Sequence, residues 1–358
     1  MKQPTALIMA GGTGGHIFPG LAVAQALRDK GWSVHWLGAP NSMESRLVPA
    51  KGFPLEVVEF SGVRGKGLQT LALLPLRLLR AFWQAWQVIG RVRPDVVVGL
   101  GGYITFPGGM MAVFRGKPLV LHEQNSVAGL VNKVLAQIAE RVFCAFPGAL
   151  AHSEWVGNPL RSEFLNVPGP QERFTGRTGP LKVLVVGGSL GAKALNTVVP
   201  KALALIPEDQ RPIVTHQAGE KQIDELRANY AAAGVQASLT AFIDNTAQAF
   251  ADADLVICRA GASTVTELAA VGAASVLVPF PHAVDDHQTS NARFLSDAGA
   301  GVLLPQTELT PEKLARMLQK TERNALIARG LEAKKLQKLT ATDNLVAACE
   351  TLAKGNAA

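Results

Sequence analysis

The stretch ALIMA-GGTGG, residues 6–15, is the most informative part of this sequence about its fold. An apolar run suited to a buried strand is followed by a turn almost without side chains and then by a helical pattern. A second stretch of the same kind, VLVV-GGSLG, occupies residues 183–191. In such turns, backbone N–H groups and a helix N-terminus approach an anion closely. Two of them, half a chain apart, predict two doubly wound domains that face each other across a cleft.

Strand-like and helix-like patterns alternate along both halves of the chain. In the first half, apolar runs predict strands at residues 6–10, 33–38, 55–58, 96–100, 119–121 and 141–144. In the second half, they predict strands at residues 182–186, 213–217, 237–240, 255–258, 274–277 and 301–304. Alternation of continuous apolar strands with helices is typical of parallel, doubly wound sheets. The predicted fold class is therefore α/β, with two Rossmann-like domains.

The predicted domains occupy residues 1–162 and 163–340. A chain of 358 residues is too long for one ordinary core, which makes two domains the default expectation. Proline, glycine and polar residues gather at 167–180, where we expect a linker or surface loop. The sequence allows the final helix, 341–358, to stay on the second domain or to cross back, and we assign it to the first.

Composition describes a well-filled globular protein. Hydrophobic residues make up 48% of the chain and charged residues 18%, which excludes a disordered chain. The cysteines, Cys144, Cys258 and Cys349, form no CxxC pair, so a zinc site and a disulfide framework are disfavoured and a reducing compartment fits. The first residues are typical of a strand, not of a signal peptide, and no apolar run reaches about 18 residues. The net charge of +7 predicts anionic partners.

Positive charge is concentrated between Phe60 and Pro94, where there is no aspartate or glutamate. The cations there are Arg64, Lys66, Arg77, Arg80, Arg91 and Arg93. Leucine, phenylalanine and tryptophan residues are interleaved with them, which is typical of an element that lies on an anionic membrane. We therefore expect residues 64–93 to contact the membrane, and no pattern here favours nucleic acid. The alternative is a helix whose core-facing stripe is Leu76, Leu79, Trp83 and Trp86.

Polar residues follow two predicted strands of the first half. His16 comes directly after the first glycine turn, and an imidazole there is suited to general base catalysis. A structural histidine near the helix start is the alternative. The segment HEQN, residues 122–125, follows the strand at 119–121 and is well placed for sugar hydroxyls or acid–base chemistry. A purely structural loop remains the alternative for this segment.

In the second half, the segment RAGASTVTE, residues 259–267, follows a predicted strand. One interpretation is a capping box, in which Ser263 or Thr264 caps a helix and Glu267 completes the box. The other is a nucleotide site, in which Glu267 accepts hydrogen bonds from ribose and the small residues admit the nucleotide. Residues 285–288, DDHQ, are either a metal site or an acidic helix start.

Several cofactor motifs do not fit this sequence. Neither glycine turn is followed by GK[ST], as a Walker motif would be. Neither matches GxGxxG, and the second predicted strand ends in LGAP, residues 37–40, with no acid for a ribose hydroxyl. Hydride transfer with NAD is therefore disfavoured. The DAD triplet at 252–254 has the spacing of metal-dependent sugar transferases, but it precedes a strand at the edge opposite to the ligand edge, so we discount it.

Taken together and in order, these motifs resemble the MurG family of peptidoglycan N-acetylglucosaminyltransferases over nearly the whole chain. The matching segments are GGTGGH (11–16), HEQN (122–125), GNPLR (157–161), GGSLG (187–191) and residues 259–267. The resemblance implies a GT-B fold and an inverting transfer, without a metal or other cofactor, from UDP-N-acetylglucosamine. The acceptor would be the 4-hydroxyl of MurNAc in undecaprenyl-pyrophosphoryl-MurNAc-pentapeptide (lipid I). The product would be lipid II for the cell wall, made at the cytoplasmic face of the inner membrane.

The resemblance also implies roles for single residues. Thr13, Gly14 and Gly15 would border the acceptor pyrophosphate and the donor sugar. Asn125 and Gln288 would bind that sugar, Arg161 and Ser189 would hold the UDP phosphates, and the backbone of Ile243 would meet uracil. The residues that would line the nucleotide are Ala262, Ser263, Thr264, Val265, Thr266 and Glu267.

A mechanism follows from these roles. The acceptor hydroxyl attacks the anomeric carbon in one displacement, with His16 as the first candidate for the general base. Glu123 is the second candidate, unless it orients a partner. The second glycine turn and Arg161 stabilise the charge on the departing UDP. Two rivals remain: a UDP-N-acetylglucosamine 2-epimerase of the same fold, and a non-catalytic peripheral membrane protein that binds the nucleotide sugar.

Overall fold

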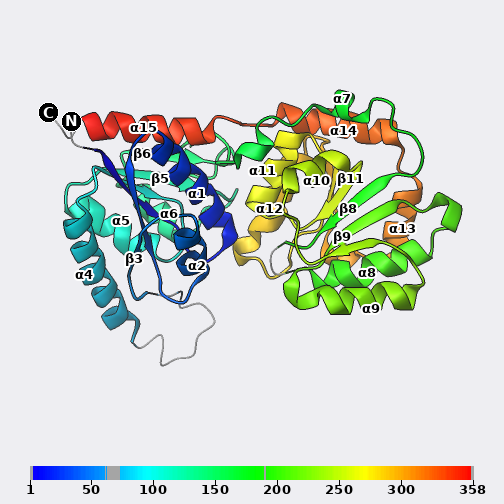
Figure 1. The fold of residues 1–358 in the computed structure, drawn as a ribbon, viewed down its shortest axis with the longest axis horizontal. Helices are drawn as coiled ribbons and strands as arrows, with labels where there is room; N and C mark the ends of the chain where they lie inside the picture. Colours follow the sequence, from blue (N-terminus) through cyan, green and yellow to red (C-terminus); the bar gives the residue numbers. More distant parts are fainter. Residues whose placement is uncertain (1–2, 61, 63–72, 189–190, 356–358) are drawn as a thin grey trace. The chain divides into compact units, whose positions relative to one another are not determined.

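The computed structural model describes residues 3–60, 62, 73–188 and 191–355, which form two compact units (Figure 1). The first unit consists of the described residues of Met1–Arg161 and Leu339–Ala358, and the second of those of Ser162–Lys338. The predicted α/β class is confirmed. Ser189 and part of the predicted membrane segment, 64–72, lie outside the described residues.

A parallel sheet forms the centre of the first unit. Among the described residues its strand order is β3-β2-β1-β4-β5-β6-β7. Every neighbouring pair is parallel, as the apolar runs predicted. The strands are β1 (Thr5–Met9), β2 (Ser33–Gly38), β3 (Leu55–Val57), β4 (Val96–Gly99), β5 (Leu119–Glu123), β6 (Arg141–Cys144) and β7 (Glu154–Trp155).

Helices cover both faces of this sheet. Alternate residues of β1 point to opposite faces, so Ala6 and Ile8 enter one core while Leu7 and Met9 enter the other. The first core includes α1 and α15, which lie side by side in Figure 1, and the second includes α4 and α5. The helices are α1 (Gly14–Asp29), α2 (Met43–Ala50), α4 (Leu74–Val92), α5 (Thr105–Phe114), α6 (Leu130–Leu135) and α15 (Ala341–Gly355).

The second unit repeats this architecture with the strand order β10-β9-β8-β11-β12-β13 in its described part. Its strands are β8 (Lys182–Val186), β9 (Ile213–Gln217), β10 (Ser238–Thr240), β11 (Leu255–Cys258), β12 (Ser275–Leu277) and β13 (Gly301–Leu303). Its α-helices are α7 (Pro170–Phe174), α8 (Lys193–Ala204), α9 (Ile223–Ala233), α10 (Thr246–Asp252), α11 (Ala262–Val271), α12 (His287–Ser296), α13 (Pro311–Gln319) and α14 (Arg323–Lys335). The short 3-10 helices are η1 (Ser162–Phe164), η2 (Glu208–Gln210), η3 (Glu220–Gln222), η4 (Val284–Asp286) and η5 (Gln306–Glu308).

The strand orders place both glycine turns at equivalent points. β1 lies between β2 and β4, and β8 lies between β9 and β11. In each sheet, the order in which successive strands are added therefore reverses beside the first strand. In doubly wound sheets, ligands bind outside the carboxyl ends of the strands at such a switch point. The GGTGG turn follows β1 and the GGSLG turn follows β8. Each unit therefore carries its glycine turn where this fold places a ligand.

Two predicted boundaries were wrong. α1 begins at Gly14, inside the stretch that the sequence predicted as a turn, because glycine has a low helix propensity and the stretch resembles a loop. The helix therefore includes His16 in its first turn. The predicted loop at 167–180 contains α7, which starts with Pro170 at a position where proline is tolerated.

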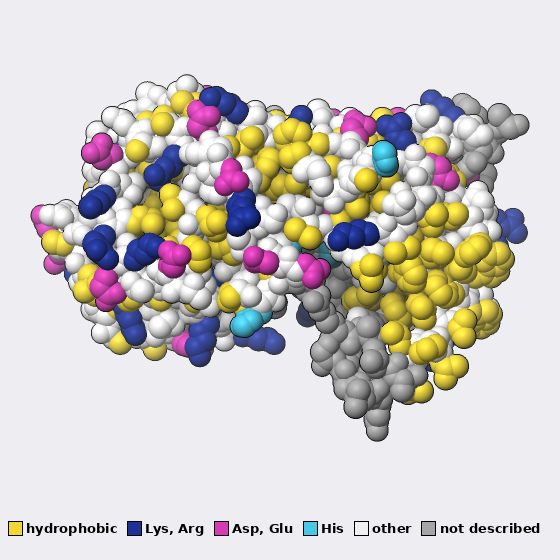
Figure 2. Space-filling model, turned by 180° about the vertical axis from the view of Figure 1, so that it is seen from behind, with side chains coloured by type: hydrophobic (Ala, Val, Ile, Leu, Met, Phe, Trp, Pro, Cys, Tyr) yellow, Lys and Arg dark blue, Asp and Glu magenta, His cyan; other side chains and the backbone are white. Residues whose placement is uncertain are grey.

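Four large apolar side chains of α4 face outward. Its buried residues are Ala81, Ala85, Val88 and Ile89, which recur at helical spacing on one face. The opposite face presents Leu76, Leu79, Trp83 and Trp86, whose exposed fractions are 66%, 64%, 60% and 40%. Figure 2 shows hydrophobic side chains gathered over this part of the first unit. The alternative in which these four residues form the core-facing stripe is therefore wrong.

Candidate active site

The first glycine turn is held by a buried carboxylate. Glu44 of α2 is fully buried, and its two oxygens accept hydrogen bonds from Gly12 N–H and Ala39 N–H, each at 3.2 Å. A Cβ on Gly11 would lie 2.7 Å from Glu44 Oε1, and Gly12 has φ +90°, so both positions favour glycine. The N-cap residue of α1, Thr13, makes no side-chain cap. The start of α1 thus offers backbone N–H groups to an anion.

His16 lies in the first turn of α1 and contacts the end of β5. Its Nδ1 is 2.6 Å from Gln124 Oε1, and its ring is half-buried. Gln124 Nε2 in turn lies 2.9 Å from His122 Nδ1 and donates to the His122 carbonyl at 3.0 Å. His122 Nε2 is 2.8 Å from the Gly157 carbonyl. The structure thus joins two predicted segments, GGTGGH and HEQN, in one hydrogen-bond chain.

Burial controls the charge of His122. The ring is completely buried, and this burial lowers the pKa of His122 to about 4. A buried imidazolium without a counter-ion is costly. His122 is therefore neutral at physiological pH.

Glu123 is turned toward its own loop. Its side chain is 2% exposed. One oxygen accepts from Asn125 N–H at 2.8 Å and from Asn125 Nδ2 at 3.4 Å. The other accepts from Asn132 Nδ2 at 2.8 Å and from Gly129 N–H at 3.3 Å. Both carboxylate oxygens therefore shape the loop that carries Asn125.

The loop after β4 closes against the first glycine turn at the switch point. Gly101 has φ +94°, and a Cβ there would lie 2.9 Å from both Cε1 and Nδ1 of His16. Gly102 has φ +86°, and its Cβ would collide with the carbonyl of Gly11. These two glycines make room for the His16 ring and for the turn beside it.

The second glycine turn is held by a glutamine. Gln217, at the end of β9, accepts from Gly188 N–H at 3.2 Å and donates to the Gly188 carbonyl at 3.1 Å. The same amide donates to the Ala241 carbonyl at 2.9 Å, so it links the turn to the loop that carries Ile243. Gly188 has φ +84°, and Ala192, the N-cap of α8, makes no side-chain cap.

The N-terminus of α11 is open. Its N-cap is Gly261, which has no side chain, so the capping-box interpretation of Ser263, Thr264 and Glu267 is wrong. The hydroxyl of Ser263 is buried and has no hydrogen-bond partner within the described ranges. Backbone N–H groups at a helix start attract anions.

Only part of the predicted nucleotide-lining segment offers side chains to a ligand. Val265 is fully buried, and Thr266 donates its hydroxyl back to the carbonyls of Ala262 and Ser263. Ser263, Thr264 and Glu267 are half-buried and lie on the more accessible side of the helix. The buried members of the segment build the helix instead.

Arg259 supports the loop between β12 and α12. Its Nη1 donates to the carbonyls of Val278 and Pro279, both at 3.1 Å, and its Nη2 donates to Gln306 Oε1 at 2.7 Å. Burial lowers the pKa of Arg259. In the same loop, Gln288 Oε1 accepts from Phe280 N–H at 2.9 Å, while no partner for Gln288 Nε2 is found among the residues that the structure describes. That amide group remains available to a sugar hydroxyl.

Comparison with known proteins follows the same division of the chain. Residues 6–144 match the glycosyltransferase family 28 N-terminal domain, and residues 182–345 match the family's C-terminal domain. The chain belongs to glycosyltransferase family 28.

Named relatives of this family 28 chain share one description. A UDP-N-acetylglucosamine–N-acetylmuramyl-(pentapeptide) pyrophosphoryl-undecaprenol N-acetylglucosamine transferase from Paracidovorax citrulli is 72% identical, covering 98% of this chain and 99% of the relative. A protein of the same description from Cupriavidus metallidurans is 62% identical, covering 99% of each. The crystal structure of Acinetobacter baumannii MurG is 38% identical with a TM-score of 0.85, covering 97% of this chain and 99% of that chain. The predicted resemblance to MurG enzymes is confirmed.

More distant structures share only the fold of family 28. A putative UDP-N-acetylglucosamine 2-epimerase from Listeria monocytogenes is 14% identical with a TM-score of 0.66, covering 98% of this chain and 97% of that chain. At this identity the likeness concerns architecture alone.

Three residues that shape the family 28 site were not predicted from sequence. Glu44 resembles an ordinary exposed acid near a helix start, because its burial depends on packing against a turn far along the chain. Gly101 and Gln217 gave no pattern of their own. Gly101 directly follows the predicted strand at 96–100, so its place at the carboxyl edge was the one available signal.

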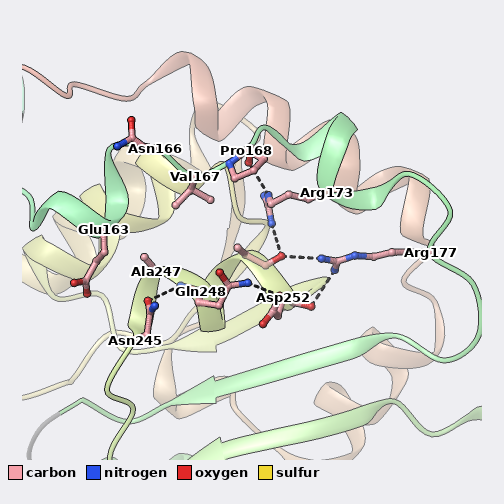
Figure 3. A pocket seen from close by; sticks show the side chains of 11 residues that line it. Glu163, Asn166, Val167, Pro168, Arg173, Arg177, Asn245, Ala247, Gln248 and Asp252 are labelled. Carbon is pink, nitrogen blue, oxygen red and sulfur yellow. Dashed lines mark hydrogen bonds between the residues drawn. The ribbon is translucent and has the colours of Figure 1, made fainter.

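A cavity of about 230 Å³ in the second unit of this family 28 chain has a structural role (Figure 3). It is lined by Glu163, residues 166–168, two arginines, and residues of α10 and its N-cap. Arg173 donates to the carbonyls of Pro168, Ala251 and Gly272 at 3.0, 2.9 and 2.8 Å. These bonds use all of its nitrogen atoms and cap the C-terminal ends of α10 and α11.

The DAD triplet of the family 28 chain lies beside this cavity and is structural too. Asp254 is buried and accepts from Arg177 at 2.8 Å, Arg323 at 3.2 Å and Lys182 N–H at 2.8 Å. Its carboxylate thus ties the amino end of β11 to two arginines.

Proposed function

We propose that this chain transfers N-acetylglucosamine from UDP-N-acetylglucosamine to the 4-hydroxyl of MurNAc in undecaprenyl-pyrophosphoryl-MurNAc-pentapeptide, giving lipid II for peptidoglycan. One observation carries the proposal: 72% identity, over nearly the full length of both chains, to a transferase whose name states this donor and this acceptor. The ordered motifs of both units support it, since none is missing.

In this proposal His16 is the general base. The acceptor hydroxyl attacks the anomeric carbon while His16 removes its proton, and the configuration of that carbon inverts. Thr13, Gly14 and Gly15 border the acceptor pyrophosphate at the start of α1. General base catalysis by a positioned histidine contributes about 10²–10⁴-fold to a rate.

Glu123 serves as a positioning residue in this proposal. The four hydrogen bonds to its carboxylate and its nearly complete burial support a role in holding the loop of Asn125. Asn125 and Gln288 then bind the N-acetylglucosamine of the donor.

The second unit binds UDP in this proposal. Backbone N–H groups of the second glycine turn, with Ser189, and Arg161, the last residue of the first unit, stabilise the diphosphate as it departs. Ile243 meets uracil through its backbone. Ser263, Thr264 and Glu267 contact the nucleotide at the start of α11, which Ala262, Val265 and Thr266 build.

We further propose that the outer face of α4 rests on an anionic membrane, where the lipid-linked acceptor resides. α5 packs against α4, and α6 packs against α5. On these two helices Phe114 and Leu130 are 67% and 78% exposed. Arg80 and Arg91 pair with Glu59 and Glu56, so these two cations are partly neutralised, while Arg77 is exposed. Among the described residues, no helix is long and apolar enough to cross a membrane. We propose a peripheral location on the cytoplasmic face, with the outer face of α4 against the membrane.

The test is UDP release from UDP-N-acetylglucosamine with and without a soluble lipid I analogue. The proposal predicts release only when the analogue is present, in proportion to disaccharide formed. UDP-N-acetylglucosamine turnover without an acceptor, yielding the 2-epimer, would favour the epimerase. Donor binding without consumption in either condition would favour a non-catalytic nucleotide-sugar binder.

A further inference from the structure

The hydrogen-bond chain from His16 to Gly157 has a single consistent direction. A backbone carbonyl only accepts, so the bond between His122 Nε2 and the Gly157 carbonyl, at 2.8 Å, places the proton of His122 on Nε2. Because burial lowers the pKa of His122 to about 4, its ring is neutral and Nδ1 is a bare acceptor. The backbone carbonyl of Gly157 thus determines which ring nitrogen of His122 carries the proton.

The proton position of His122 determines the orientation of the Gln124 amide, the next group in the hydrogen-bond chain. The amide nitrogen of Gln124 faces two acceptors, His122 Nδ1 at 2.9 Å and the His122 carbonyl at 3.0 Å. The amide must therefore present its NH₂ to His122 and its oxygen to His16. That oxygen, 2.6 Å from His16 Nδ1, accepts the hydrogen bond. His16 consequently carries its ring proton on Nδ1.

We infer that His122 and Gln124 are positioning residues that hold His16 in the tautomer protonated on Nδ1, which leaves Nε2 bare to receive the acceptor's proton. The bond that one ring nitrogen makes determines which nitrogen is the base. Within the described part of the chain, Nε2 of His16 has no partner. The inference rests on the proposed function, because it assigns the base its reacting atom.

In this arrangement the group that orients His16 is a neutral amide and not a carboxylate. The nearby carboxylate, Glu123, has both oxygens committed to its own loop. When His16 receives a proton on Nε2, its Nδ1–H bond to Gln124 becomes charge-assisted and stronger. Gln124 has no proton to take up or pass on at neutral pH, so the positive charge stays on His16.

The backbone around the chain leaves room for this geometry. Gly101 would place a Cβ 2.9 Å from His16 Nδ1 and 3.3 Å from Gln124 Oε1, so any side chain there would open the bond between them. Gly157 adopts φ +86°, a conformation that glycine accepts without strain, while its carbonyl meets His122.

The direct test is ¹⁵N NMR of the full-length protein labelled at histidine, which distinguishes protonated from bare ring nitrogens. His16→Ala identifies the His16 signals. In the parent protein at a pH where the ring is neutral, we expect the His16 proton on Nδ1 and none on Nε2. A His16 ring protonated on Nε2, or an even mixture of tautomers, would overturn the inference. This readout needs no turnover, so it stands even if the proposed reaction fails.

Gln124→Met removes the amide at similar volume, and we expect His16 to lose its single tautomer. Gln217→Met is the matched control: it removes a buried glutamine from the other unit and leaves the His16 signals unchanged. If Gln124→Met does not fold, Gln124→Glu still offers an oxygen to His16 and should keep the proton on Nδ1. An unchanged His16 tautomer in folded Gln124→Met would contradict the inference.

A kinetic cycle separates positioning from general structural support. We expect Gln124→Met to lower kcat by about 10²-fold, with the donor KM changed by less than about threefold. In the His16→Ala background, the same change should lower kcat by less than about twofold, because its effect acts through His16. An equal loss in both backgrounds would show a structural role and overturn the inference. Normal turnover in His16→Ala alone would instead reject His16 as the base.

Discussion

At the scale of single residues, the candidate active site depends on a histidine with neutral neighbours. His16 contacts an amide, and through it a buried neutral histidine, while the one carboxylate of the segment shapes a loop. In the proposed mechanism His16 gains a full positive charge during the reaction, and the group that it contacts among the described residues is a neutral amide. The negative charge that develops on the departing diphosphate would therefore complement it electrostatically.

His16→Ala should lower kcat by about 10²–10⁴-fold with little change in the donor KM, because the base acts only on the reacting proton. Steady-state kinetics with a soluble acceptor analogue measures both constants. His152→Asn is the control, since this exposed histidine has φ +57° and asparagine tolerates that conformation. Near-normal kcat in His16→Ala would remove His16 from the mechanism.

Gly101→Ala should lower kcat by at least about tenfold, because its Cβ would lie 2.9 Å from the His16 ring and displace it. Gly116→Ala is a matched control: Gly116 also has a positive φ, +65°, but its Cβ would meet no atom within 4 Å. The two variants share backbone strain and differ in the collision. Equal kinetic losses in both would mean that strain, not His16, explains the effect.

At the scale of elements, helices of this fold have two different roles, one at the surface and one in stability. α4 exposes two leucines and two tryptophans on its outer face, where an ordinary surface helix carries mostly polar residues. Arg173 joins the ends of α10 and α11 to the segment that starts the second unit. The first feature belongs to membrane contact in our proposal, and the second to stability.

Trp83→Glu should weaken binding to anionic vesicles by about tenfold or more, because it replaces exposed apolar area with a negative charge. Vesicle co-sedimentation measures the binding, and turnover of a soluble acceptor analogue should stay within about twofold. Leu205→Glu, which changes a side chain that is 53% exposed in the second unit, is the matched control and should leave vesicle binding unchanged. Equal vesicle binding by all three proteins would reject α4 as the membrane face.

Arg173→Met should reduce the free energy of unfolding by about 2–4 kcal/mol, because it leaves the carbonyls of Ala251 and Gly272 without their donor. Urea unfolding measures this loss. Arg227→Met is the control: it removes an exposed ion pair and should lower the free energy of unfolding by less than about 0.5 kcal/mol. Equal costs for the two variants would contradict the capping role.

At the scale of the whole molecule, most of the fold was predictable because the parallel strands are buried on both faces. β1, β4 and β8 appear in the sequence as uninterrupted apolar runs, and the glycine turns mark their ends. The sequence could not show which side of α4 packs against the core, because both of its sides carry apolar residues. Glu44 and Gln217 depend on contacts with distant turns, which local patterns do not contain.

Acid should destabilise both units. Burial lowers the pKa of His122 in the first unit to about 4 and that of His216 in the second to about 3. The unfolded chain binds a proton at each near pH 6.5, so stability is present above that value and is lost as the pH falls toward the folded pKa. Between about pH 7 and about pH 5, protonation of each histidine in the unfolded chain should lower the free energy of unfolding by about 2 kcal/mol. In urea titrations, the free energy of unfolding of the second unit should fall less with acid in His216→Gln than in the parent protein. An identical fall in both proteins would contradict the role of His216.

NMR of the product formed from UDP-N-acetylglucosamine and a soluble lipid I analogue distinguishes the proposed transfer from its rivals. We expect one disaccharide, with N-acetylglucosamine β-linked to the 4-oxygen of MurNAc, and one UDP for each disaccharide formed. An α-linked product would contradict the single inverting displacement. A free 2-epimer without disaccharide would contradict the transferase itself.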